Sequence, residues 1–287
     1  MTKYLPAAAA ATTGILVGAA IVATRFVIGQ TGPATLALLR YLIGFGCLLP
    51  LLLLSERVLF ARRDLLPIGL LGITQFGVVV MLLNYALQYI PSGRAALIFA
   101  TLPLITMLLA TVLGYERVTL IKALGVLATI VGVGLVLGEQ AIRPMSSGDQ
   151  WLAMLAVLAS AACGALCSVL YRPYLQKYPT LAVSVFAMLA SVLALALIAA
   201  GEGFWSAPPH FTAAGWLAVG FIGVSSGVGY YLWLWALNHS SATNVTVFLA
   251  LSPVSATILG AVALAEIPSA TTLFGLACGA LGIWMAQ

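Results

Sequence analysis

The chain has 287 residues, of which 63% are hydrophobic and only 7% are charged, and its mean hydropathy is +1.14. Soluble domains carry about 25% charged residues, so this composition excludes a water-soluble globular protein. The formal net charge is +5, and the positions of the basic residues are more informative than their number.

Apolar runs of about 17–25 residues recur along the chain, the length of helix that crosses a hydrocarbon core about 30 Å thick. The strands of a transmembrane barrel would instead alternate apolar and polar residues. The runs therefore predict an all-α polytopic membrane protein with ten transmembrane helices. In chain order the predicted spans cover residues 5–24, 34–54, 65–88, 93–113, 120–137, 151–170, 181–200, 211–237, 243–265 and 270–286.

The basic residues of the short loops indicate the orientation, because loops rich in Lys and Arg stay in the cytoplasm. If the N-terminus is cytoplasmic, eight basic residues fall on that side: Lys3, Arg57, Arg62, Arg63, Arg117, Lys122, Arg172 and Lys177. Three fall outside, namely Arg25, Arg94 and Arg143. We therefore expect a multi-pass protein of a bacterial inner (plasma) membrane with both termini in the cytoplasm.

Two stretches 150 positions apart share a pattern: ATLPLITMLLATVLGYE at 100–116 and ALSPVSATILGAVALAE at 250–266. The same shift aligns residues 84–137 with 234–287 without a gap. The matched pairs include Pro103/Pro253, Glu116/Glu266, Gly125/Gly275 and Gly132/Gly282. These matches predict two copies of a five-span unit. Because five is odd, the second copy enters the membrane from the opposite side, which makes an inverted repeat.

The repeat predicts the domain organisation. Residues 1–137 form the first repeat with spans one to five, residues 138–150 an outer connecting loop, and residues 151–287 the second repeat with spans six to ten. Transporters with inverted repeats bind their substrate near the membrane midplane, between the two halves.

The matched prolines and glutamates have different expected roles. A proline inside a helix frees a carbonyl group and bends the axis, so Pro103 and Pro253 are predicted to bend spans four and nine alike. The alternative is that both prolines are merely tolerated in buried membrane helices. Glu116 and Glu266 end these spans and are predicted to anchor the helix ends.

Polar side chains within the spans are candidates for substrate binding, because embedding them in lipid is expensive. Arg40 lies about 10 Å along the second span at about 1.5 Å per residue. It could hold a substrate carboxylate or support a helix end. In the third span, 3/4 spacing places four side chains on one face: Met81, Asn84, Tyr85 and Gln88.

Aromatic and small polar residues of other spans complete the candidate cavity. Tyr230 and Trp233 form one stripe of the eighth span, although Trp233 could instead belong to an interfacial aromatic belt. The remaining lining candidates are Phe99, Thr101, Asn244 and Ser252.

The chain as a whole resembles the drug/metabolite transporter superfamily, specifically its EamA-type members, among them YddG-like exporters. The resemblance rests on LRYLIGFGCLLPLLL at 39–53, ALQYIPSGRAALIFATLPLITMLLATVLGYERVTLIKALGVLATIVGVGLVL at 86–137 and ALNHSSATNVTVFLALSPVSATILGAVALAEIPSATTLFGLACGALGIWMA at 236–286. It implies export of amino acids, aromatic and neutral ones included, and of other small metabolites.

All seven acidic residues fall in loops or at span ends, so none is placed where a proton-coupled carrier keeps a carboxylate relay. We therefore expect facilitated diffusion or exchange by alternating access. An organophosphate or nucleotide-sugar antiporter is the alternative, and it would need several cationic side chains besides Arg40. A drug efflux carrier is a further alternative.

A membrane-embedded enzyme is a distant alternative, because His210 and His239 lie in different loops and no HExxH or acidic metal cluster is present. No cofactor or metal is expected. The expected partners are a small-molecule substrate and the lipid bilayer, without nucleic acid, and the protein is expected to be a monomer or a weak homodimer.

Overall fold

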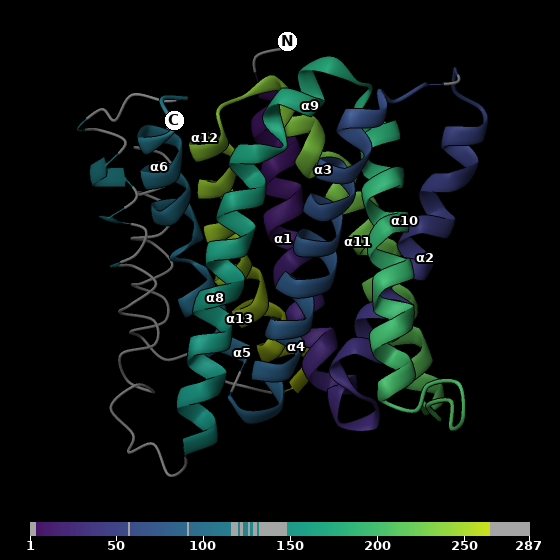
Figure 1. The fold of residues 1–287 in the computed structure, drawn as a ribbon. Coiled ribbons are helices and arrows are strands. Elements are labelled where there is room, and N and C mark those ends of the chain that lie inside the picture. Colours follow the sequence, from purple (N-terminus) through teal and green to yellow (C-terminus); the bar gives the residue numbers. More distant parts are fainter. Residues whose placement is uncertain are drawn as a thin grey trace.

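The computed structural model describes residues 4–56, 58–90, 92–115 and 148–264, together with residues 120, 123–125, 127, 128 and 131. Throughout this described part the regular structure is helical and no strand occurs. The long helices run side by side as a bundle (Figure 1). The all-α class that hydropathy predicts is thus confirmed.

Seven described stretches are long and apolar enough to cross a membrane, which confirms a multi-pass membrane protein. They are Leu5–Gln30, Pro33–Leu53, Arg62–Tyr89, Asp149–Lys177, Thr180–Gly201, Ala213–His239 and Ala242–Val262. They correspond to predicted spans one to three and six to nine. Predicted spans 120–137 and 270–286 lie outside the described residues, apart from a few positions of the former, and so do Glu116 and Glu266.

The helices before residue 116 include one continuous stretch with a π-helical turn and one interrupted span. In order they are α1 (Leu5–Val27), the 3₁₀ turn η2 (Ile28–Gln30), α2 (Pro33–Leu53), α3 (Arg62–Gly72), the π-helical turn η3 (Ile73–Val78), α4 (Val79–Tyr89), α5 (Ser92–Phe99) and α6 (Leu102–Val112). Pro33 and Pro103 stand in the first turns of α2 and α6. Backbone N–H groups there have no partner within the helix, so a proline costs no hydrogen bond.

Further helices follow from residue 148 onward. They are α8 (Gly148–Leu170), α9 (Arg172–Lys177), α10 (Thr180–Gly201), α11 (Ala213–His239), α12 (Ala242–Val247), the 3₁₀ turn η4 (Phe248–Ala250) and α13 (Leu251–Leu264). Thr212 begins α11 as its N-cap, and its hydroxyl oxygen accepts a hydrogen bond from the Gly215 amide at 3.1 Å.

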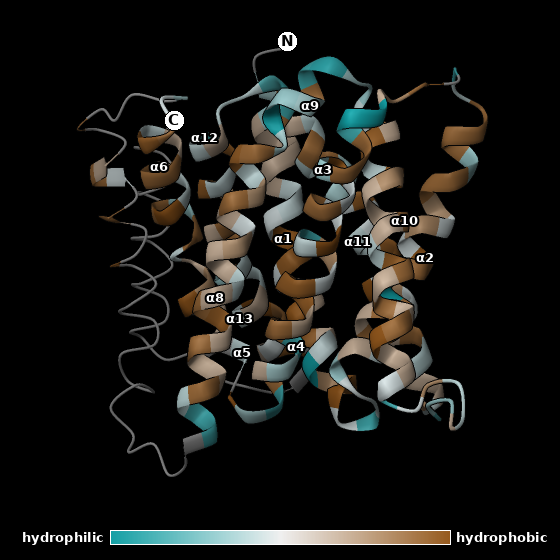
Figure 2. Ribbon diagram, in the orientation of Figure 1, coloured by the Kyte–Doolittle hydropathy of each residue, from teal (hydrophilic) through white to brown (hydrophobic). Residues whose placement is uncertain are grey.

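The outer surface of the bundle is apolar along the middle of the helices and polar at their ends (Figure 2). Large side chains at mid-helix positions, such as Leu42, Leu193 and Val224, are exposed there. In water such a surface would be unfavourable, whereas in a bilayer it faces lipid tails of the same polarity.

Pairs of helices approach closely where glycines meet. Helix α1 packs along α11 and α13, and α2 packs between α10 and α11. At the α2–α11 crossing, a Cβ atom on Gly44 would lie 3.2 Å from the Gly227 backbone nitrogen, and one on Gly227 would lie 2.9 Å from the Gly44 Cα. Small residues at such crossings let membrane helices pack backbone to backbone.

We call the end of the bundle where α1 begins the N face, and the opposite end the distal face. At the N face, Asp64 near the start of α3 pairs with Lys177 and accepts a hydrogen bond from the Tyr178 hydroxyl at 2.6 Å. The same hydroxyl accepts a bond from the Ala61 amide at 3.0 Å. These bonds tie the start of α3 to the α9–α10 connection.

At the distal face, Glu202 ties the end of α10 to the start of α2. Its two carboxylate oxygens accept hydrogen bonds from the backbone amides of Ala34 at 2.9 Å and Thr35 at 2.8 Å. A carboxylate at this place also interacts favourably with the helix dipole. Nearby, the Gln30 side-chain oxygen accepts a bond from the Thr212 amide at 3.2 Å.

Replacing Gly44 by Val should destabilise the protein, because the added methyl groups would separate α2 from α11. We expect a loss of about 1–3 kcal/mol, typical of overpacking. Thermal unfolding of the purified protein in detergent would measure it. Gly46→Val is the matched control on the same helix, since a Cβ there has no neighbouring atom within 4 Å. Equal melting temperatures for the two variants would contradict this packing.

Candidate functional site

A cavity opens at the centre of the bundle. Together with the open space at its mouth, its empty volume is about 820 Å³. Side chains from α1, α2, η3, α4, α8 and α11 line it, together with Phe99, Leu102 and Leu249 from the two interrupted spans. Apart from tyrosine and tryptophan, its polar lining residues are Thr13, Arg40, Gln75, Ser168, Ser225 and Ser226. Among these described lining residues, only Arg40 is charged.

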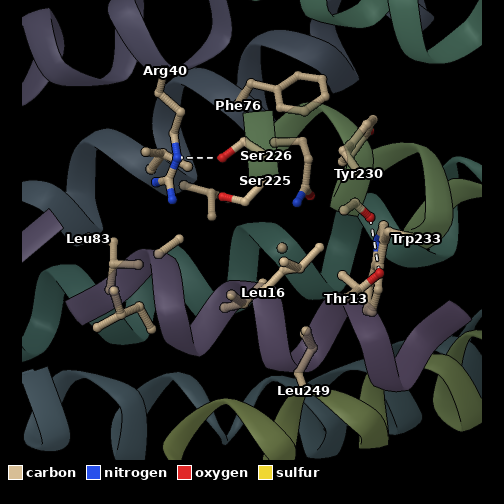
Figure 3. Close-up of a pocket in the computed structure, with 18 of the residues that line it drawn as sticks. Thr13, Leu16, Arg40, Phe76, Leu83, Ser225, Ser226, Tyr230, Trp233 and Leu249 are labelled. Carbon is tan, nitrogen blue, oxygen red and sulfur yellow. Dashed lines mark hydrogen bonds between the residues drawn. The ribbon is translucent and has the colours of Figure 1, made fainter. Parts of the chain in front are cut away.

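Arg40 enters the cavity from α2 and is 92% buried, with an exposed fraction of 8%. Its Nε donates a hydrogen bond to the Ser226 hydroxyl on α11 at 2.7 Å (Figure 3). The nearby Gly44–Gly227 crossing brings the two helices close enough for this bond. No described residue accepts a bond from the two terminal nitrogens, so their donors are available to an anionic group in the cavity.

A row of aromatic rings forms the wall beside Arg40. The ring of Tyr41 lies 4.7 Å from that of Phe76, which lies 4.0 Å from that of Tyr230. Tyr230 also contacts Tyr171, with ring centroids 6.3 Å apart. These edge-to-face arrangements are the favourable ones for aromatic pairs. The wall offers an apolar side chain a large contact area.

Helix α11 contributes two aromatic side chains to the cavity. Tyr230 and Trp233 both face it (Figure 3). Trp235, on another face of the helix, stacks instead on His239 at the helix end, with ring centroids 4.2 Å apart. Tyr230 and Trp233 therefore belong to the cavity, while Trp235 lies at the end of the helix.

All four residues of the predicted polar face of the third span lie outside the central cavity. Asn84 is fully buried and donates to the Pro33 carbonyl oxygen at 3.0 Å, at the start of α2. Met81 and Tyr85 are half-buried, and Gln88 is exposed near Arg25 at the distal face. The cavity is lined instead by Val79, Val80 and Leu83, which share another face of α4.

Gln75 lies in the turn directly before α4, and the sequence analysis did not identify it as a lining residue. It belongs to η3, in which the Val79 amide bonds to the Thr74 carbonyl five residues earlier. Its side chain lines the cavity, and its Oε1 is buried without a hydrogen-bond partner among the described residues. A glutamine inside an apolar run is itself a signal of an embedded polar group.

Spans four and nine are both interrupted directly before their prolines. Helix α5 ends at Phe99 and α6 begins at Leu102, while η4 separates α12 from α13. Pro103 and Pro253 thus stand in the first turns of new helices rather than within continuous ones. Phe99 on one side and Leu249 on the other bring both interruptions to the cavity.

The remaining predicted lining residues serve local structure. Thr101 donates to the Ile98 carbonyl at 2.7 Å within the first interruption. Ser252 is buried against α1. The two backbones are so close that a Cβ added to Gly18 would lie 2.2 Å from the Ser252 carbonyl oxygen. Asn244 lies in the first turn of α12, where its backbone N–H donates a hydrogen bond to the Ser241 hydroxyl oxygen at 3.2 Å. None of the three lines the central cavity.

Among the described residues, no three His, Cys, Asp or Glu side chains lie close enough to hold a metal ion. The arrangement instead suits reversible binding of a small molecule with an anionic group and an apolar part.

The sequence matches the profile described as the EamA-like transporter family twice, over residues 5–138 and 151–286. A relative from Streptantibioticus cattleyicolor, named probable terminal-alkyne amino-acid exporter, is 32% identical over 78% of this chain and 73% of its own length. An uncharacterized transporter from Archaeoglobus fulgidus is 26% identical over 93% of each chain. The uncharacterized inner membrane transporter YedA of Escherichia coli K12 is 27% identical over 86% of this chain and 78% of its own.

A solved crystal structure of a protein has the same fold. It superimposes with a TM-score of 0.80 over 97% of this chain and 94% of the other, at 24% identity.

Replacing Asn84 by Asp should lower stability rather than alter binding. The carboxylate cannot donate to the Pro33 carbonyl and would be a buried charge, which we expect to cost about 2 kcal/mol or more. Gln88→Glu, exposed on the same span, is the matched control and should unfold like the wild type. If Asn84→Asp unfolded normally but bound no ligand, Asn84 would belong to the binding site after all.

Proposed function

Because the chain belongs to the EamA-like transporter family, within the drug/metabolite transporter superfamily, we propose that it exports small zwitterionic metabolites, above all neutral and aromatic amino acids. The protein is a membrane transporter and not an enzyme.

The observation that carries the substrate proposal is the pairing of Arg40 with an aromatic wall. The free guanidinium donors of Arg40 match the two oxygens of a carboxylate, and Tyr41, Phe76 and Tyr230 match an apolar side chain. An amino acid carries both groups. The Streptantibioticus relative, whose name specifies an amino-acid exporter, supports the same class.

We further propose ten spans in two inverted halves, residues 1–137 and 151–287, joined by the loop 138–150. Two hydrogen bonds support this. The Thr13 hydroxyl on α1 donates to the Gly229 carbonyl at 3.0 Å, and the Ser160 hydroxyl on α8 donates to the Val79 carbonyl at 2.8 Å. Thr13 and Ser160 are 147 positions apart, and Val79 and Gly229 are 150 apart. The same bond thus recurs between corresponding helices.

Alternating access follows from this architecture. Matched interruptions before Pro103 and Pro253 give each half a break in its helical hydrogen bonding beside the cavity, at which the helix can bend. If the two halves exchange conformations, the cavity opens alternately to either side of the membrane. Both prolines then serve as hinges.

Transport without proton coupling is the proposed energetic mode. Among the described cavity residues there is no carboxylate, and Asp64 and Glu202 lie at opposite faces. Facilitated diffusion or exchange fits this arrangement. An organophosphate antiporter is less well supported, because Arg40 is the cavity's one cationic side chain in this part of the structure.

Counterflow in proteoliposomes would test the substrate proposal. Wild-type protein should exchange labelled aromatic and aliphatic amino acids, and Arg40→Gln should lower the rate at least tenfold because the carboxylate loses its charged partner. Arg40→Lys should retain part of the activity. Arg63→Gln, an exposed arginine of the N face, is the control and should transport normally.

Two outcomes of the same assay would contradict the proposal. Saturable uptake of sugar phosphates without amino acids would overturn the substrate class. Strong acceleration by a pH gradient would overturn transport without proton coupling.

The proposed orientation places the N face in the cytoplasm of a bacterial inner membrane. In a variant with its native cysteines replaced by Ser, Ser206→Cys at the distal face, an exposed position after α10, should react with a membrane-impermeant maleimide in intact cells. Arg63→Cys at the N face should react only after permeabilisation. The reverse labelling pattern would show the opposite orientation.

A further inference from the structure

The third span contains one residue more than its counterpart in the second half. The N-caps of α3 and α11 are Ala61 and Thr212, which are 151 positions apart, whereas Val79 and Gly229 are 150 apart. Both N-cap amides donate to a side chain of the other half, from Ala61 to Tyr178 and from Thr212 to Gln30. The two starts are therefore equivalent, and the extra residue falls between Ala61 and Val79.

The π-helical turn η3 is where the extra residue is accommodated. A π turn takes up one additional residue within an α-helix, and such turns are frequent at functional sites. Helix α11 runs from Ala213 to His239 as a continuous α-helix. The turn is thus a local departure from the proposed symmetry, and it lies beside the cavity.

Gln75 is the polar residue that this turn brings to the cavity. Its neighbour Phe76 contacts Tyr41, the neighbour of Arg40, with ring centroids 4.7 Å apart. Gln75 and Arg40 therefore stand on adjoining walls of one cavity. The Gln75 Oε1 has no hydrogen-bond partner among the described residues, and rotation of the terminal amide can present this oxygen to a ligand.

We propose that Gln75 is a specificity-determining residue whose side-chain oxygen accepts a hydrogen bond from the ammonium group of the substrate while Arg40 binds its carboxylate. This rests on the proposed function. A neutral acceptor suits the site, because the described cavity residues include no carboxylate for the ammonium group. Gln75 then distinguishes an α-amino acid from the α-hydroxy acid of the same side chain, whose neutral hydroxyl makes a weaker bond.

Competition in the counterflow assay would test this assignment. The probes are phenylalanine and its α-hydroxy analogue phenyllactate, measured with wild-type protein and with Gln75→Met, which keeps the volume and removes the amide. We expect the wild type to prefer phenylalanine. In Gln75→Met the half-saturation concentration for phenylalanine should rise at least tenfold, and that for phenyllactate less than twofold.

Further variants separate binding from folding. Gln75→Asn, which keeps an amide on a shorter side chain, should retain part of the preference for phenylalanine over phenyllactate. Gln88→Met, at an exposed glutamine of the same span, should leave this preference unchanged. An unchanged preference in Gln75→Met, or an equal loss for both ligands, would overturn the assignment. A wild-type protein that transports neither ligand would instead refute the proposed function.

Discussion

A polar group inside a membrane protein needs a partner within the protein, and here that requirement falls most heavily on Arg40. Glycines at the α2–α11 crossing let a long side chain from one helix reach Ser226 on the other, which binds the Arg40 Nε. The terminal nitrogens remain directed to the cavity. The same contact therefore packs two spans together and holds an anion-binding group where the proposed substrate would lie.

The two proposed halves share a framework but differ at the cavity. Thr13 and Ser160 make corresponding hydrogen bonds, and both interrupted spans reach the cavity. Arg40, in contrast, corresponds under the 147-position shift to Ala187, which packs closely against Gly72. A symmetric framework can provide two equivalent open states, whereas asymmetric polar groups can bind an asymmetric molecule.

Composition and periodicity were sufficient for the all-α membrane class and for the seven long spans of the described residues. A helix in lipid needs a long apolar run, so each run is visible without knowing its neighbours. An embedded charge is equally visible because it is costly, and Arg40 was found on that ground. The Tyr230–Trp233 stripe followed from helical spacing alone.

Which neighbours each helix face contacts is visible only in the tertiary structure. Spacing places Asn84 and Gln88 on one face, but it does not say that this face meets the start of α2 or the distal surface. The π turn changes the phase of the third span and brings Gln75 to the cavity. Helical periodicity is a property of one segment, whereas a binding site is defined by contacts between segments far apart in the chain.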